Sequence, residues 1–254
     1  MRLGALIEAA RRPSAPHDVG RKPVVAVLGM HRSGTSAIAG MLQEHGVDLG
    51  PVSERNRFNP RGNREIKELN TLHDRILERS GGSWWDPPPS AVLRASDFRV
   101  RNRILRAIRG ETIGVKDPRM LLVLDLWRDL DLRPIGVIRN PVAVRESLER
   151  RAHNRRRRHP QLPGAAWERL WIVYNRALLA EHERKTFPVI DFDRHEDLHL
   201  RVRAALERHD LAAAGGSGFF EPELTRGQDG DWRPRAASRE AVELWDALAA
   251  LAAP

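Results

Sequence analysis

The chain has 254 residues and a formal net charge of +9, with 41% hydrophobic and 30% charged residues. A length and hydrophobic content of this order suit one folded domain and exclude a disordered chain. The sequence contains no cysteine, which excludes disulfides and thiolate chemistry. No segment approaches the ~18 consecutive apolar residues of a membrane-spanning helix, and the N-terminus shows no apolar signal core. We therefore expect a soluble protein of the cytoplasm.

Short β-branched runs alternate with longer amphipathic segments along the chain. Such an alternation predicts an α/β fold with a mostly parallel sheet and helices on both faces. We expect a single domain of this kind over residues 23–254, preceded by a loosely ordered arm over residues 1–22. The predicted strands are residues 24–28, 113–115, 134–138 and 187–191, the predicted helices are residues 33–45, 63–79, 121–129, 142–151 and 196–209, and a further helical spacing of core residues runs from Trp167 to Leu178.

The segment that follows the first predicted strand has the composition of a phosphate-binding loop. Its sequence, over residues 29–36, is Gly-Met-His-Arg-Ser-Gly-Thr-Ser. A glycine-bounded loop between a strand and a helix directs backbone N–H groups and the positive end of the helix dipole to one point. Nucleotide hydrolases carry a lysine where this chain has Thr35, and they use that lysine for transfer of the γ-phosphoryl group. The segment therefore predicts an anion site whose nearest cation is Arg32.

Two further segments place charged residues at the ends of predicted strands. Arg139 follows the strand over residues 134–138, and Ser147 lies eight positions later, about two turns into the next helix. The element over residues 116–119, Lys-Asp-Pro-Arg, follows the preceding predicted strand. Because ligands of open α/β sheets bind at the carboxyl ends of the strands, these residues are candidates for one common site.

These motifs, in this order, resemble those of the PAPS-dependent sulfotransferases, and the resemblance extends from about residue 24 to residue 226. Bacterial members of that family carry a Gly-Met-His-Arg-Ser-Gly-Thr-Ser loop and a Lys-Asp-Pro-Arg element, and their later Trp and Tyr-Asn pattern is similar to Trp171 and Tyr174-Asn175. The resemblance implies a P-loop-like sulfotransferase fold and the transfer of a sulfuryl group from 3′-phosphoadenylyl sulfate (PAPS) to a hydroxyl group, without a metal. The product nucleotide would be adenosine 3′,5′-bisphosphate. The residues that the resemblance assigns to PAPS are Arg32, Ser33, Gly34, Thr35 and Ser36 at the 5′-phosphate, and Arg139, Ser147 and Arg226 at the 3′-phosphate.

The same resemblance suggests catalytic residues. Bacterial relatives carry a glutamate after an Asn-Pro-x-Gly stretch similar to residues 59–62, which makes Glu65 the leading general base. Lys116 is the candidate for stabilising the oxygens of the transferred sulfuryl group, and Arg32 for stabilising the charge that develops on the leaving oxygen. The alternatives are that Glu65 only complements the dipole of the following helix, and that Lys116 only forms an ion pair.

Histidine provides the reserve candidates for the base. Animal members of the family place a histidine two positions after a lysine, but Pro118 stands at that position in this chain. The role would then fall to His31 inside the loop, or to His73 in the helix predicted over residues 63–79.

The resemblance implies that the acceptor is a small-molecule hydroxyl, and a sugar, a glycolipid or a secondary metabolite would fit. A loop over residues 81–89, rich in proline and glycine, holds Trp84 and Trp85. Such a pair suits a sugar or another planar acceptor, or else packs beneath its own loop. The arginine run over residues 155–158 is interpreted as a surface loop or as a site for an acidic partner. The sequence does not indicate the oligomeric state.

Two other functions fit parts of the sequence. A small-molecule or nucleoside kinase would use a similar loop, but it requires the missing lysine and an acidic magnesium ligand. A nucleic-acid-binding module would account for the net charge, but the chain has one tyrosine and six phenylalanines and no basic segment interleaved with aromatic residues. We prefer the sulfotransferase, with no nucleic acid among its expected partners.

Overall fold

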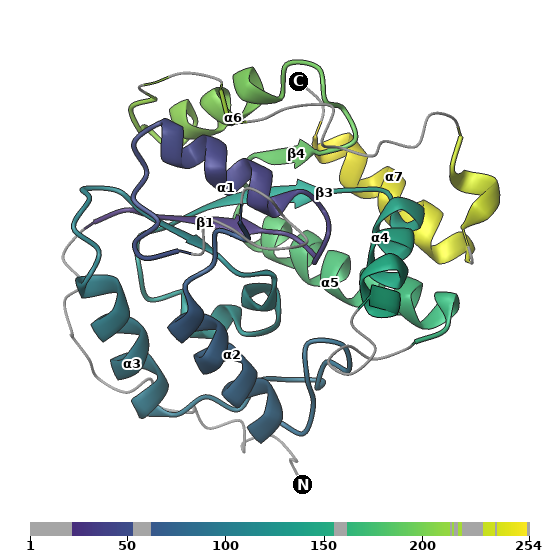
Figure 1. Ribbon diagram of the computed structural model, residues 1–254, viewed down its shortest axis with the longest axis horizontal. Coiled ribbons are helices and arrows are strands. Elements are labelled where there is room, and N and C mark those ends of the chain that lie inside the picture. The colour runs from purple at the N-terminus through teal and green to yellow at the C-terminus, as the bar shows by residue number, and fades with distance from the viewer. Residues whose placement is uncertain are drawn as a thin grey trace, which may run out of the picture.

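Four parallel strands form the centre of the molecule (Figure 1). The computed structural model describes residues 22–52, 62–154, 162–213, 215, 218–219, 231–236 and 238–252. The strands lie in the order β2-β1-β3-β4, and each pairs with its neighbours in parallel. Their bounds are β1 Val24–Leu28, β2 Ile113–Lys116, β3 Leu132–Ile138 and β4 Val189–Asp191.

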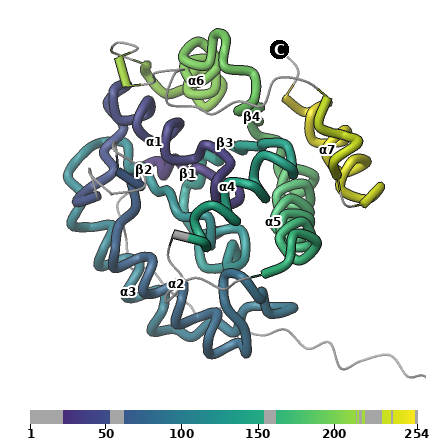
Figure 2. The backbone as a smooth tube through the Cα atoms, turned by 45° about the vertical axis from the view of Figure 1, so that its right-hand side comes forward, coloured from purple at the N-terminus to yellow at the C-terminus, as the bar shows by residue number. Residues whose placement is uncertain are grey.

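Helices cover both faces of this sheet. Val25 and Val27 of β1 belong to one apolar core, and the other three residues of β1 belong to the core on the opposite face. This alternation explains why β1 is apolar throughout, since both of its faces are buried. Figures 1 and 2 show α1 and α6 on one side of the sheet and α2, α3 and α5 on the other. The helices are α1 Thr35–Glu44, α2 Lys67–Arg79, α3 Ala95–Arg106, α4 Pro141–Asn154, α5 Gly164–Arg184, α6 Leu198–Glu207 and α7 Arg239–Leu251.

The order of the strands brings several loops to one edge of the sheet. The chain passes from β1 to β2 on one side and then to β3 on the other, which creates a switch point at the carboxyl end of β1. In the register of the sheet, Val27 lies beside Lys116, and Leu28 lies beside Gly136. Ile138 lies beside Asp191. The segments that follow all four strands therefore begin along the same edge.

The predicted fold class is confirmed: the chain forms a single α/β domain around a parallel sheet with helices on both faces. Most predicted elements are present with ends shifted by a few residues. The helix predicted over residues 121–129 is wrong, because the structure has two 3-10 helices there, at Pro118–Leu122 and Leu124–Leu126. The apolar side chains of this segment are buried on more than one side, so a continuous amphipathic helix is not needed to bury them.

Two helices were not predicted from the sequence. Helix α3 buries Asp97, Arg101 and Asn102, and its apolar stripe is correspondingly thin. Helix α7 is alanine-rich and follows Ser238, whose side chain accepts a hydrogen bond from the N–H of Ala241 and so caps the helix. A further 3-10 turn at Arg233–Arg235 precedes it.

Candidate functional site

The loop between β1 and α1, residues 29–34, lies tightly against the end of the sheet. A Cβ atom at Gly29 would lie 2.5 Å from the carbonyl oxygen of Val137, so only glycine allows this approach to β3. Arg32 and Gly34 both have left-handed backbones, with φ of 71° and 88°. Such a conformation costs free energy for a side-chain-bearing residue and is characteristic of ligand-binding turns. The β1–α1 loop is therefore held in a strained turn around the N-terminus of α1.

The N-terminus of α1 lacks the usual partners of a helix start. Gly34 is the N-cap residue and brings no side-chain hydrogen bond, and the first turn of α1 has no acidic residue. The side chain of Ser33 is fully buried, and its Oγ has no hydrogen-bond partner in the described part of the chain. Because a helix start offers N–H groups and positive potential, this end of α1 has the properties of an anion site.

Arg32 joins this loop to helix α4. Its Nε donates a hydrogen bond to Oγ of Ser147 at 2.9 Å, and its carbonyl oxygen accepts one from Nη1 of Arg139 at 3.3 Å. Burial and the nearby guanidinium groups of Arg151, Arg139 and Arg150 lower the pKa of Arg32 to about 10. Three arginines thus lie close enough to Arg32 to repel its charge, and a bound anion would relieve that repulsion.

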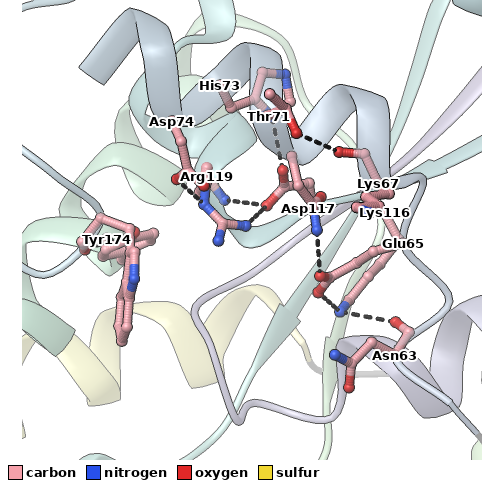
Figure 3. Close-up of polar contacts among 12 residues, drawn as sticks. Asn63, Glu65, Lys67, Thr71, His73, Asp74, Lys116, Asp117, Arg119 and Tyr174 are labelled. Atoms are coloured by element: carbon pink, nitrogen blue, oxygen red, sulfur yellow. Dashed lines mark hydrogen bonds and ion pairs between the residues drawn. The ribbon is translucent and has the colours of Figure 1, made fainter. Parts of the chain in front are cut away.

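Glu65 lies immediately before α2 and is held by two donors (Figure 3). Its Oε1 accepts a hydrogen bond from Nζ of Lys116 at 2.6 Å, and its Oε2 accepts one from Nδ2 of Asn70 at 2.8 Å. Lys116 also donates to the carbonyl oxygen of Asn63 at 3.1 Å, and that oxygen accepts a second bond from Oγ of Ser36 at 3.1 Å. One carbonyl therefore connects the Glu65–Lys116 pair to the first turn of α1.

Beside this pair lies a buried network around Asp117. The carboxylate accepts hydrogen bonds from Nδ1 of His73 at 2.8 Å and from Nη1 of Arg119 at 2.9 Å. Burial alone would raise the pKa of Asp117, but the Arg119 guanidinium and the His73 hydrogen bond outweigh it and lower that pKa. Arg119 donates in addition to Asp74 at 2.6 Å. We call the two groups together, Glu65 with Lys116 and Asp117 with its partners, the α2 network.

The tautomer of His73 follows from its second contact. The indole N–H of Trp127 donates to Nε2 of His73 at 3.2 Å, so Nε2 is an acceptor and the hydrogen resides on Nδ1, which donates to Asp117. Both ring nitrogens are engaged and the side chain is fully buried. His73 is therefore placed to orient Asp117, and it offers no nitrogen to an acceptor.

His31 lies in the β1–α1 loop among aromatic rings. Its ring centroid is 4.4 Å from that of Trp84 and 5.9 Å from that of Tyr174. Burial and then the charge of Arg119 lower the pKa of His31 well below its ordinary value, so the imidazole is neutral at neutral pH. Its Nε2 is buried without a hydrogen-bond partner among the described residues.

The two tryptophans of the loop over residues 81–89 have different surroundings. Trp84 is buried between the rings of His31 and Trp167, and the hydroxyl of Tyr174 donates to its carbonyl oxygen at 2.9 Å. Trp85 is 39% exposed and contacts Trp84 edge-on. Of the pair, Trp85 is the ring that a molecule from solution can reach.

The predicted site residues therefore fall into two groups. Arg32, Arg139 and Ser147 converge at the start of α1, while Glu65 and Lys116 form an ion pair that is linked to the same helix. Arg226 and the arginine run over residues 155–158 lie outside the described residues, as do residues 1–21 of the predicted arm. The residues that the sequence did not single out are Asn63, Asn70 and Asp193, which hold Lys116, Glu65 and Arg139 respectively.

The described residues also bear on metal binding and on membrane insertion. No group of three or more histidine, aspartate or glutamate side chains in them is arranged to hold a metal ion. None of the helices that the structure describes combines the length and apolar character needed to cross a membrane.

A parallel sheet with a glycine-bounded loop at the end of its central strand defines a P-loop-like fold. Among solved structures, the chain is similar to the sulfotransferase domain from the olefin synthase of Synechococcus PCC 7002. The TM-score is 0.56 over 94% of this chain and 98% of that one, at 16% sequence identity. The chain therefore has a sulfotransferase-type fold, and at this identity the likeness concerns the fold alone. No family model matches the chain, and no match is found among curated proteins.

Proposed function

We propose that this protein is a sulfotransferase that moves a sulfuryl group from PAPS to a hydroxyl group of a small molecule. The observation that supports it best is the 2.9 Å hydrogen bond between Arg32 and Ser147. It joins two motifs that are 115 residues apart, within a cluster of four arginines. A donor with two separate phosphate groups requires cations in such an arrangement.

The residues on the α1 side fit such a nucleotide. The N–H groups at the start of α1, those of Thr35 and Ser36 among them, bind the 5′-phosphate together with the buried Oγ of Ser33 and the Thr35 hydroxyl. The Ser36 hydroxyl donates to the Asn63 carbonyl. Arg139 and Ser147 bind the 3′-phosphate, and Arg226 is proposed to close over it. Arg32 stabilises the negative charge that develops on the 5′-phosphate oxygen as its bond to sulfur breaks.

The α2 network provides the groups for the acceptor. Glu65 takes the proton of the acceptor hydroxyl while the hydroxyl oxygen forms its bond to sulfur. Lys116 and Asn70 hold the Glu65 carboxylate in one orientation. Lys116 also lies where an ammonium group can stabilise the sulfuryl oxygens, since it shares the Asn63 carbonyl with Ser36.

Glu65 is preferred over the histidines as the base for two reasons. His73 has both nitrogens engaged. For His31, the depressed pKa makes the imidazolium that a general base must form unfavourable at neutral pH. His31 remains able to accept a hydrogen bond as a neutral ring.

Calorimetry with adenosine 3′,5′-bisphosphate and with AMP tests this proposal. A charge-assisted hydrogen bond contributes about 1.5–3 kcal/mol, so the wild type should bind the bisphosphate about ten- to a hundredfold more tightly than AMP. Sulfuryl transfer from PAPS to a panel of small hydroxyl compounds should persist in EDTA. Equal affinity for the two nucleotides would contradict the proposal, and magnesium-dependent phosphoryl transfer from ATP would support a kinase in its place.

A further inference from the structure

Asp193 lies just after β4 and contacts two residues at the end of β3. Its Oδ1 accepts a hydrogen bond from Nε of Arg139 at 3.3 Å. Its Oδ2 accepts one from the backbone N–H of Asn140 at 2.7 Å and one from Nδ2 of Asn140 at 2.9 Å. A single carboxylate thus spans the guanidinium of Arg139 and both N–H donors of the next residue.

The contact with Asn140 reaches helix α4. Oδ1 of Asn140 accepts a hydrogen bond from the N–H of Ala143 at 2.8 Å, which satisfies one of the free donors at the start of that helix. Ser147 lies on α4, and its Oγ accepts from Arg32. Asp193 therefore fixes the direction of Arg139. Through Asn140 it also fixes the start of α4, the helix on which Ser147 lies.

The position of Asp193 is itself fixed. Its backbone N–H donates to Oδ1 of Asp191 at 2.9 Å, which holds the turn that leaves β4. The indole N–H of Trp171 donates to the carbonyl oxygen of Arg139 at 2.9 Å and holds the backbone on the other side. The carboxylate is 25% exposed, so it is accessible at the edge of the arginine cluster without being mobile in solvent.

The negative charge of Asp193 opposes anion binding while its hydrogen bonds favour it. A carboxylate beside the arginine cluster repels an incoming phosphate through the Coulomb interaction, which solvent screens at a partly exposed position. The hydrogen bonds hold Arg139 and the start of α4 in the geometry that a phosphate group requires, and such preorganisation increases affinity. Asp193 favours phosphate binding only if the second effect is the larger, and the experiment below decides between the two effects.

We propose that Asp193 is a positioning residue for the 3′-phosphate, which it serves by orienting Arg139 and Ser147 without contacting the nucleotide. The inference rests on the proposed function, because the proposed function assigns the 3′-phosphate to Arg139 and Ser147. It predicts that loss of Asp193 lowers the affinity for adenosine 3′,5′-bisphosphate but not that for AMP, which lacks the 3′-phosphate.

Calorimetry on Asp193→Ala and Asp193→Asn at constant salt tests the inference. Asp193→Ala should bind the bisphosphate about tenfold more weakly than the wild type, as expected for the loss of a charge-assisted contact, with AMP affinity unchanged. Asp193→Asn should give an intermediate loss of about threefold, because one amide oxygen can replace only part of the carboxylate. The control Glu196→Gln removes the same charge from an exposed position in the same segment and should change neither affinity.

The outcomes separate the two proposals. A wild type that does not distinguish the bisphosphate from AMP overturns the proposed function and this inference with it. If the wild type prefers the bisphosphate and Asp193→Ala binds it as tightly as the wild type or more tightly, only the role of Asp193 is overturned. If Asp193→Ala does not fold, Asp193→Asn decides, and bisphosphate affinity equal to that of the wild type contradicts the inference.

Discussion

On the α1 side of the site, Arg32 lies near other arginines and contacts no carboxylate among the described residues. On the α2 side, Lys116 and Arg119 each contact a carboxylate. The consequence appears in the pKa values. Burial and like charges lower the pKa of Arg32, while the Asp117 and Asp74 carboxylates outweigh burial and raise the pKa of Arg119. The protein therefore pairs both cations of the α2 side with carboxylates, whereas on the α1 side Arg139 contacts the Asp193 carboxylate and Arg32 has no carboxylate partner among the described residues.

This difference indicates what each region can do. Like charges held close together destabilise the folded protein unless a ligand of opposite charge is bound. Charges that are paired and hydrogen-bonded instead hold side chains in fixed orientations, which is what a proton-transfer group requires. This difference supports the proposal that the α1 side binds the anionic donor and that the α2 network positions the acceptor.

The largest expected effect concerns Glu65, the proposed base on the α2 side. Glu65→Gln should lower turnover by about 10²- to 10⁴-fold, since a positioned base contributes about that much, and should leave the affinity for adenosine 3′,5′-bisphosphate unchanged. Steady-state kinetics and calorimetry on the same preparation check both expectations. His31→Ala is the paired control, and normal turnover in Glu65→Gln together with an inactive His31→Ala would assign the base to histidine.

The next effect concerns the leaving group on the α1 side. Arg32→Ala should lower the turnover number by about 10²- to 10³-fold, as removal of one preorganised stabiliser of developing charge does. The affinity for adenosine 3′,5′-bisphosphate should fall by less than turnover. Near-normal turnover in Arg32→Ala would assign the role to another cation, such as Lys116. Leaving-group stabilisation would then not be confined to the α1 side.

A smaller effect is expected on nucleotide binding. Arg139→Ala should weaken the binding of adenosine 3′,5′-bisphosphate about ten- to a hundredfold, because it removes a charge-assisted contact. AMP binding, measured by the same calorimetry, serves as the internal control and should stay close to that of the wild type. An equal loss for both nucleotides would show that Arg139 supports the fold of the site and does not select the 3′-phosphate.

The fold and the strand, loop and helix of the α1 side could be predicted from the sequence, because these features are local. The strand Val24–Leu28 is apolar throughout, and the glycine-bounded loop follows it directly, so strand, loop and helix can be recognised within about a dozen residues. Arg139 was recognised by its place at a strand end, and Ser147 by its spacing from it. The parallel sheet then brings such strand ends to one edge.

Two of the supporting residues, Asp193 and Asn63, were not predicted because their partners are distant in the chain. Asp193 lies 54 residues from Arg139, and Asn63 lies 53 residues from Lys116. Nothing in the local sequence distinguishes either residue from a surface polar residue before the sheet assembles. The burial of Trp84 is likewise decided by distant residues, since its ring packs against those of His31 and Trp167. Only tertiary packing, which overrides local pattern, decides these contacts.

The smallest expected effect concerns Asp191, a carboxylate on the cationic side that the arginines do not neutralise. Burial, opposed by a backbone hydrogen bond from Asp193, raises its pKa to about 6, and the Asp193 charge adds to the rise. Arg201 and Arg194 lower the pKa without cancelling this shift. The pKa of Asp191 in the folded protein lies above its unfolded value of about 3.9. The stability that Asp191 contributes is therefore complete below a pH of about 3.9 and is lost as the pH rises through about 6.

Asp191→Asn should therefore stabilise the protein relative to the wild type by up to about 3 kcal/mol near pH 7.5, as the cited shift implies, and hardly at all near pH 4. The amide oxygen can still accept the bond from the N–H of Asp193. Urea unfolding of both proteins at several pH values measures the difference, and the control Glu196→Gln should show no such pH dependence. A stability difference that does not change with pH would mean that Asp191 is already neutralised by a cation, and the α1 side would then resemble the α2 network more closely than we infer.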